Sequence, residues 1–184
     1  MVLASESPQR RAILERVGVP FTIRPSRVQE LEQGDPAEVA LENALRKARA
    51  VRRTDTPETV LGCDTLVALE NEIYGKPRDE RAARSTLNAL SGATHEVVSG
   101  VALLVEGKER STLARTAVTF RRLDDRLVAW YLATGEWRGR AGGYAIQGAG
   151  AALVRAVEGD YENVVGLPLA TLLDLCPELI FACK

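Results

Sequence analysis

The sequence has little of what metal-centred or disulfide-stabilised proteins usually carry. Its 184 residues contain one histidine, His95, and three cysteines that show no Cys-x-x-Cys spacing. A single histidine excludes sites built from several histidines, and the cysteine spacing indicates neither a zinc site nor a disulfide framework. A reducing cytoplasm is therefore the expected location.

Long apolar runs and a strong net charge are also missing. No apolar stretch approaches the ~20 residues that span a bilayer, and the start, MVLASESPQRR, lacks the basic-then-apolar order of a signal peptide. The formal net charge of −1 gives no reason to expect binding to nucleic acid or to a membrane. With 46% hydrophobic and 27% charged residues, the composition is that of a soluble globular chain. We expect one domain over residues 1–184.

The common phosphate-binding loops are absent as well, since neither GxxxxGK[ST] nor GxGxxG after a strand occurs. With a single histidine as well, a hydrolytic site in this chain must work with carboxylates, basic side chains and hydroxyls, with or without a bound cation.

Helix and strand patterns alternate along the chain. Helical spacing and capping residues predict helices over 8–17, 35–53, 79–92, 124–135 and 167–175, and apolar or alternating runs predict strands over 2–4, 59–69, 72–77, 94–106, 107–120 and 151–159. Residues 139–150 carry five glycines, too many for a regular element. Because helix-joined strands and hairpins both occur, the predicted class is α/β around a mixed sheet.

Two arginines stand early in the first predicted helix. In LASESPQRR, Ser7 is placed as N-cap and Pro8 as first helical residue, so Arg10 and Arg11 fall in the first turn. Cations are mildly disfavoured there by the helix dipole, whereas anions bind well. An anion beside this turn would resolve the conflict.

Lysine is rare, since only four of the 24 basic residues are lysine. Lys47 shares a helix face with Ala40, Ala44 and Val51, which should pack inward, and Lys76 lies in GKP after a strand. One interpretation is that each ammonium reaches water past the core. The other is a compact cation directed at phosphate oxygens.

Two carboxylates are further candidates. Asp64 follows the apolar residues of TVLGC, where an α/β sheet usually carries its ligand, although a turn-forming aspartate is the competing interpretation. Glu30 precedes the second helix and, taken alone, fits a solvated surface glutamate.

Six blocks in this order resemble the Maf family of nucleoside triphosphate pyrophosphatases: LASESPQRRAILERVGVPF, GCDTLVAL, GKPRD, LSGATHEVVSGVAL, RAGGYAIQG and GDYENVVGLPL. The resemblance implies a single-domain fold like that of inosine triphosphatases, a twisted mixed sheet flanked by helices. It also implies a cytoplasmic homodimer that requires a divalent cation, Mg²⁺ or Mn²⁺. The implied reaction converts a nucleoside triphosphate to the monophosphate and pyrophosphate by attack of water at the α-phosphorus.

The resemblance also implies roles for individual residues. Asp64 takes the position of the proton acceptor, and Glu30 and Asp64 are candidates for the metal. Five residues match positions that hold the triphosphate: Ser5, Ser7, Arg10, Lys47 and Lys76. Arg11, the second arginine of the first turn, is added to these substrate-binding candidates. Gln9, Thr65 and Gln147 match positions that choose the substrate. The family usually has arginine where this chain has Gln9.

Gln147 points to a pyrimidine substrate. Uracil and thymine present a carbonyl acceptor beside an N–H donor, and a glutamine amide offers the complementary pair. In the family, glutamine here accompanies action on dTTP and UTP. The competing interpretation is a glutamine that bonds its own loop.

Two other function classes remain open. One is a nucleotide-binding regulator without turnover, linked to cell division. The other is a cysteine hydrolase that uses Cys63 and His95, although Cys63 falls in a buried-looking strand, where thiols are usually inert.

Overall fold

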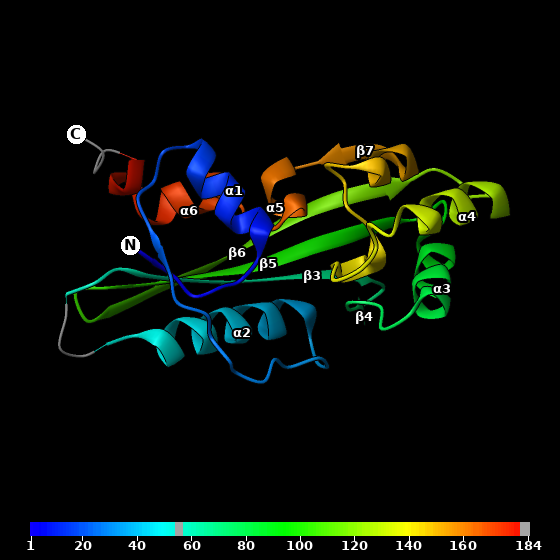
Figure 1. Ribbon diagram of the computed structural model, residues 1–184. Coiled ribbons are helices and arrows are strands. Elements are labelled where there is room, and N and C mark those ends of the chain that lie inside the picture. The colour runs from blue at the N-terminus through cyan, green and yellow to red at the C-terminus, as the bar shows by residue number, and fades with distance from the viewer. Residues whose placement is uncertain (54–56, 181–184) are drawn as a thin grey trace.

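A seven-stranded mixed sheet forms the centre of the computed structural model, which describes residues 1–53 and 57–180 (Figure 1). The strands are β1 (Val2–Leu3), β2 (Thr22–Ile23), β3 (Val60–Leu69), β4 (Glu72–Tyr74), β5 (Thr94–Val105), β6 (Lys108–Phe120) and β7 (Val154–Glu158). Their order is β2-β1-β3-β5-β6-β7, with β4 paired to β3. β1 runs parallel to β2 and β3, and the other pairs are antiparallel. The predicted α/β class and mixed sheet are confirmed.

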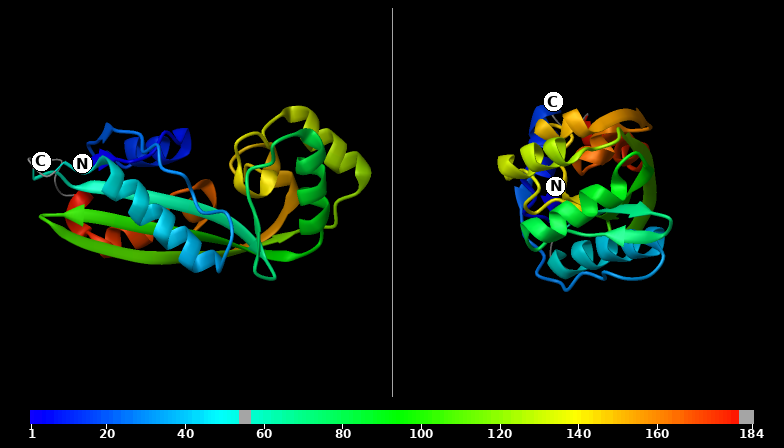
Figure 2. Two further views of the ribbon diagram at one scale, coloured as in Figure 1. Left: turned by 90° about the horizontal axis from the view of Figure 1, so that it is seen from below. Right: turned by 90° about the vertical axis from the view of Figure 1, so that its right-hand side faces the viewer.

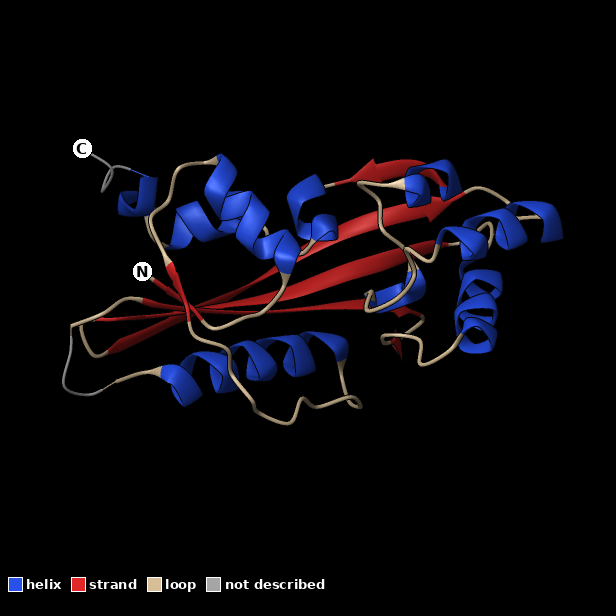
Figure 3. Ribbon diagram, viewed as in Figure 1, coloured by secondary structure: helices blue, strands red, loops and turns tan. Residues whose placement is uncertain are grey.

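Helices cover both faces of the sheet (Figure 3). They are α1 (Pro8–Arg16), α2 (Pro36–Val51), α3 (Glu80–Leu90), α4 (Asp125–Thr134), α5 (Tyr161–Val165) and α6 (Leu169–Leu175). α2 lies along one face, while α1, α5 and α6 lie on the other (Figure 1). α3 and α4 pack together at one end of the sheet (Figure 2). None of the helices in the described ranges is long and apolar enough to cross a membrane.

The apolar core is divided between the part that carries α1 and α6 and the end that carries α3 and α4. One apolar cluster joins α1 and α6 to the first residues of β3 and the last residues of β5, through residues such as Leu14, Leu61 and Leu172. Another lies among α3, α4 and the far ends of the long strands, around Leu87, Phe120 and Tyr131. The molecule therefore has a sheet body and an end lobe, each with its own packed interior.

The sequence patterns miss only the shortest elements. β2 has two residues and α5 has five, too few to produce a periodic signal. The glycine-rich segment contains short 3₁₀ turns at Ala141–Gly143 and Ala149–Leu153, and the second of these replaces the first residues of the strand predicted over 151–159. A further 3₁₀ turn, Pro177–Ile180, follows α6. Cys183, one of the three cysteines in the sequence, and the rest of 181–184 lie outside the described residues.

Two glycines fix the position of α2 on the sheet. A Cβ at Gly62 of β3 would lie 2.1 Å from the carbonyl oxygen of Ala44, and one at Gly100 of β5 would lie 2.2 Å from that of Ala40. Such distances are far inside van der Waals contact, so only glycine permits this approach. The helix backbone thus rests on the strand backbone, and the inward face of α2 lies over β3.

One edge of β3 is open where the inward face of α2 lies over this strand. β1 pairs with Val60 and Leu61, and β4 pairs with the segment 67–69, so residues 62–66 have no strand on that edge among the described residues. The strand predicted over 59–69 contains Asp64, and the structure confirms it, because Asp64 lies within β3, just beyond the point where β1 leaves it. The narrower placements of Asp64, at the end of a strand or in a turn, are wrong.

Candidate functional site

A cavity of about 560 Å³ opens at this edge of β3. Its walls come from the loop before α1, the loop around Glu30, α2, β3, the segment 139–147 and the end of α5. Ten of the proposed site residues line it: Ser5, Ser7, Gln9, Arg10, Glu30, Lys47, Asp64, Thr65, Lys76 and Gln147. The structure thus brings together residues that are up to 142 positions apart in the chain (147 minus 5).

Arg11 does not line this cavity. Its side chain is 57% exposed and pairs with Glu15 one turn later on α1, with Nε 2.7 Å from Oε1. The two arginines of the first turn therefore lie in different surroundings, and only Arg10 reaches the cavity.

Hydroxyl groups organise the entry into α1. Ser7 is the N-cap, and its Oγ accepts a hydrogen bond from the backbone N–H of Arg10 at 3.5 Å. The same hydroxyl donates to Oε1 of Gln9 at 3.1 Å, and the Ser7 N–H donates to Oγ of Ser5 at 3.2 Å. The first turn is thus closed by its own side chains, and its polar groups line the cavity.

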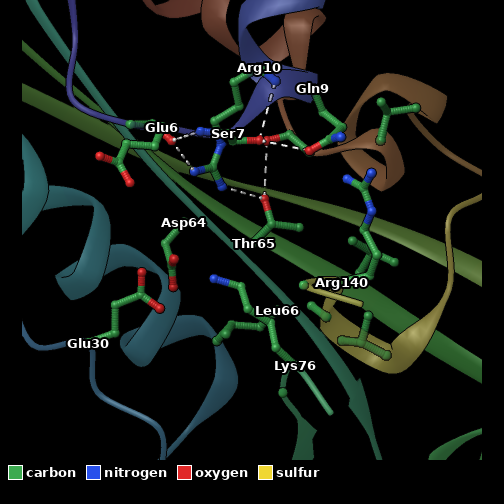
Figure 4. A pocket seen from close by; sticks show the side chains of 18 of the residues that line it. Glu6, Ser7, Gln9, Arg10, Glu30, Asp64, Thr65, Leu66, Lys76 and Arg140 are labelled. Carbon is green, nitrogen blue, oxygen red and sulfur yellow. Dashed lines mark hydrogen bonds between the residues drawn. The ribbon is translucent and has the colours of Figure 1, made fainter. Parts of the chain in front are cut away.

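Arg10 is a buried cation whose hydrogen bonds all go to neutral oxygens. Nε donates to the carbonyl of Gly166 at 2.9 Å, Nη1 to Oγ of Ser5 at 3.0 Å and Nη2 to Oγ1 of Thr65 at 3.2 Å (Figure 4). Thr65 is held in turn by Ser99, with 2.8 Å between the hydroxyl oxygens. Within the described residues no carboxylate pairs with this guanidinium, although a buried charge is normally paired. The site is therefore suited to an anion.

Lys47 joins the two candidate carboxylates. Its Nζ lies 2.5 Å from Oδ1 of Asp64 and 2.7 Å from Oε1 of Glu30. The side chain is only 8% exposed, so the ammonium does not reach past the core into bulk water, which was one of the two interpretations. Burial raises the pKa of Glu30, but the hydrogen bond and charge of Lys47, with the charges of Lys76 and Arg10, outweigh it and lower that pKa. Glu30 is therefore held as a carboxylate.

Asn43 is a residue that the sequence reasoning missed. Its side chain is fully buried, and its amide nitrogen donates to Oδ2 of Asp64 at 2.9 Å and to the carbonyl of Leu31 at 3.0 Å. Its position one helical turn before Lys47, on a face made mostly of alanine and valine, was the available signal. A polar amide on an inward-facing stripe requires partners there.

Arg140 is the second residue that the sequence reasoning missed. Like Lys76, it is a cationic side chain that lines the cavity. Figure 4 shows Arg140 on the opposite side of Thr65 from Glu30 and Asp64, extending toward Gln9. Its buried Nε has no hydrogen-bond partner among the described residues. Lys76 is exposed, and no ion pair to it occurs in the described ranges. Two cationic side chains at the cavity thus have no ion pair with an acidic side chain in the part of the chain that the structure describes.

The donors suit a magnesium or manganese ion that is shared with a substrate. The described residues contain no group of three or more histidine, cysteine or acidic side chains that forms a metal site. Glu30 and Asp64 instead give two carboxylates linked through one ammonium. Mg²⁺ typically takes one or two carboxylates and fills its other positions with water and substrate phosphates. The residues present fit that pattern.

The cysteine and histidine pair has no counterpart in the structure. Cys63 is fully buried and faces Val101 across β3 and β5. His95 precedes Val101 by six residues on β5, which at about 3.3 Å per residue separates it from Cys63 by roughly 20 Å. His95 bonds the hydroxyl of Tyr144 at 2.9 Å and stacks edge-on against Phe120. A cysteine hydrolase built on these two residues is therefore wrong.

Comparison with known proteins places this geometry in a family. The chain matches the family described as Maf-like protein over residues 1–179. It is 51% identical over 179 residues to the dTTP/UTP pyrophosphatase of Moorella thermoacetica, covering 95% of this chain and 92% of that protein. It is 45% identical over 177 residues to that of Pyrococcus furiosus, with 95% and 93% covered, and 44% identical over 176 residues to that of Deinococcus radiodurans, with 95% and 90% covered. With a family match of this extent and relatives this similar, the chain belongs to the Maf family.

Proposed function

We propose that the protein hydrolyses nucleoside triphosphates, with dTTP and UTP preferred, to the monophosphate and pyrophosphate. Arg10 is the observation that carries the proposal, because a buried guanidinium bonded only to neutral oxygens needs an anion. Lys47 and Lys76 add positive charge to the cavity, and Lys47 contacts Asp64 directly. The relatives named dTTP/UTP pyrophosphatase support both the reaction and the substrate class.

In the proposed reaction a water molecule attacks the α-phosphorus and the bond from that phosphorus to the bridging oxygen breaks. The water forms the new oxygen of the monophosphate, pyrophosphate leaves, and Asp64 accepts the proton. A positioned base typically contributes ~10²–10⁴-fold to the rate. Asp64 is suited to this role because Lys47 and Asn43 each hold one of its oxygens, which fixes the carboxylate plane.

Charge neutralisation is the other requirement of phosphoryl transfer. Arg10, Lys47 and Lys76 are proposed to hold the triphosphate, with the hydroxyls of Ser5 and Ser7 beside it. Glu30 and Asp64 would hold a divalent cation, Mg²⁺ or Mn²⁺, which when bound supplies further neutralisation at the phosphates.

The base is proposed to lie toward Gln9, Thr65 and Gln147. Gln147 is exposed at the cavity, and no hydrogen bond ties its side chain to its own loop within the described residues. An untied amide is free to pair with the donor and acceptor of uracil or thymine.

Assembly and location are further proposals that rest on the family resemblance. We propose that the protein is a homodimer and that it is located in the cytoplasm. Sedimentation velocity tests the dimer against the 20.0 kDa mass of one chain. A single species at about 40 kDa is the expected result.

The test of the function is pyrophosphate release from a panel of triphosphates with Mg²⁺. We expect turnover, fastest with dTTP and UTP. The matched control is Asp64→Asn, which keeps the size of the side chain and removes its charge, and it should lower turnover at least ~10²-fold in a folded protein. Binding of nucleotide without release of pyrophosphate would instead support the regulator, which the intact Asp64, Lys47 and Lys76 do not favour.

A further inference from the structure

Asn43 connects the two proposed metal-binding carboxylates. On one side its amide nitrogen donates to Oδ2 of Asp64 at 2.9 Å. On the other side it makes two hydrogen bonds to the backbone of Leu31, the residue next to Glu30. Nδ2 donates to the Leu31 carbonyl at 3.0 Å, and Oδ1 accepts from the Leu31 N–H at 2.7 Å. One side chain thus contacts β3 and the loop that carries Glu30.

These contacts use the amide fully. Both N–H groups of Asn43 and its oxygen have partners, and the residue has no exposed surface. A residue that only tied the Leu31 loop to α2 would need one donor and the acceptor. The second donor is directed at Asp64, which a loop tether alone does not explain.

The orientation of Asp64 depends on two neighbours along one helix face. Asn43 holds Oδ2 and Lys47, one turn later on α2, holds Oδ1. Because Gly62 and Gly100 bring α2 into backbone contact with the sheet, this face has little freedom to shift. The carboxylate plane of Asp64 is therefore set by the helix.

We propose that Asn43 is a positioning residue that fixes Asp64 and Glu30 relative to each other. It acts on Asp64 directly and on Glu30 through the backbone of Leu31. This inference rests on the proposed function, and it assigns to the reaction a residue that does not line the cavity. Displacement of a reacting group by about 1 Å is enough for a loss on the order of 10²-fold in rate.

Two variants of similar size separate the contact with the Leu31 amide from the contact with Asp64. Asn43→Leu removes every polar side-chain contact. Asn43→Asp keeps an acceptor for the Leu31 N–H and removes both donors, the one to Asp64 and the one to the Leu31 carbonyl. We expect kcat to fall at least tenfold in both, with KM for UTP within about threefold of wild type, because Arg10 and Lys76 are untouched. Hydrogen exchange at the Leu31 amide should be at least tenfold faster in Asn43→Leu and near wild type in Asn43→Asp.

The control is Val51→Ala, a buried change at the far end of α2 that should lower the melting temperature and leave kcat unchanged. A wild-type kcat in both folded Asn43 variants, or a rise in KM with kcat unchanged, would overturn the proposal. Hydrogen exchange at the Leu31 amide that is unchanged in Asn43→Leu would also overturn the proposal. If the wild type releases no pyrophosphate from any triphosphate, the proposed function fails, while exchange at Leu31 still decides whether the tether exists.

Discussion

At the scale of single residues, the site separates cations that are already paired from cations that are not. Lys47 is engaged by Asp64 and Glu30, and Arg10 is engaged by neutral oxygens. Lys76 is exposed at the cavity and no ion pair to it occurs among the described residues. These cations therefore differ in what their removal does to stability, and Lys76 gives the cleanest test of phosphate binding.

Lys76→Ala should weaken substrate use without weakening the fold. We expect KM for UTP to rise about tenfold or more, with the melting temperature within about 1 °C of wild type, because surface substitutions away from packed features change stability little. Lys108→Ala is the matched control, since Lys108 is an exposed lysine in the β5–β6 hairpin away from the cavity. Equal kinetics in the two variants would remove Lys76 from the proposed phosphate site.

Gln147 decides the choice of base in this account. Gln147→Glu replaces a donor with a second acceptor, which no longer complements the imide edge of uracil. A mismatched buried polar pair costs about 1–3 kcal/mol, so the preference for UTP over GTP in kcat/KM should fall roughly ten- to a hundredfold. Competition kinetics measure this ratio, and the same ranking of triphosphates in both proteins would show that Gln147 does not contact the base.

At the scale of elements, the contact of α2 with β3 and β5 builds the side of the cavity that holds Asp64. The helix brings Asn43 and Lys47 over Asp64, and the contact exists because Gly62 and Gly100 leave room for its backbone. A change in this packing is thus expected to reach the chemistry as well as the stability.

Gly62→Ala tests this coupling. The new methyl group meets the Ala44 carbonyl, so α2 must move outward, and overpacking of this kind typically costs about 1–3 kcal/mol. We expect a lower melting temperature and a kcat reduced at least tenfold. Leu45→Ala is the control on the same helix, because it removes packing without pushing α2 off the sheet. If both variants lose stability equally and both keep wild-type kcat, the position of α2 does not govern the site.

The elements also show what sequence can and cannot predict. The inward face of α2 was predicted from the spacing of Ala40, Ala44 and Lys47, and each is buried. Asn43 was missed because its partners, Leu31 and Asp64, are contributed by other segments, and periodicity reports a face without reporting what it meets. Arg11 was grouped with Arg10 for a similar reason, since adjacent helix positions point about 100° apart and only the fold decides which one meets the cavity.

At the scale of the whole molecule, the cavity lies between the sheet body and the end lobe. The body supplies Arg10, Lys47 and Asp64, while the segment that follows α4 supplies Arg140 and Gln147. The proposed phosphate and base contacts thus come from two parts with separate apolar cores. No motif spacing in the sequence encodes that meeting, which was predicted only through resemblance to a family.

His95 makes the stability of the end lobe depend on pH. Burial lowers its pKa from 6.5 to about 4, so the unfolded chain takes up this proton first as the pH falls. Stability is therefore lost between pH 6.5 and 4, by up to about 3 kcal/mol. His95→Phe removes the titration, and although it also removes the bond to Tyr144, its free energy of unfolding should fall less between pH 7 and pH 5. An equal fall in both proteins, measured by urea unfolding, would rule out His95 as the cause.

Isotope labelling shows whether water attacks the α-phosphorus of a pyrimidine nucleoside triphosphate in this protein. UTP is hydrolysed by the protein with Mg²⁺ in water enriched in ¹⁸O, and the products are analysed by mass spectrometry. We expect one ¹⁸O atom in UMP and none in pyrophosphate, because the new oxygen is bonded to the phosphorus that water attacks. Label in pyrophosphate, or UDP with labelled orthophosphate as the products, would contradict attack at the α-phosphorus.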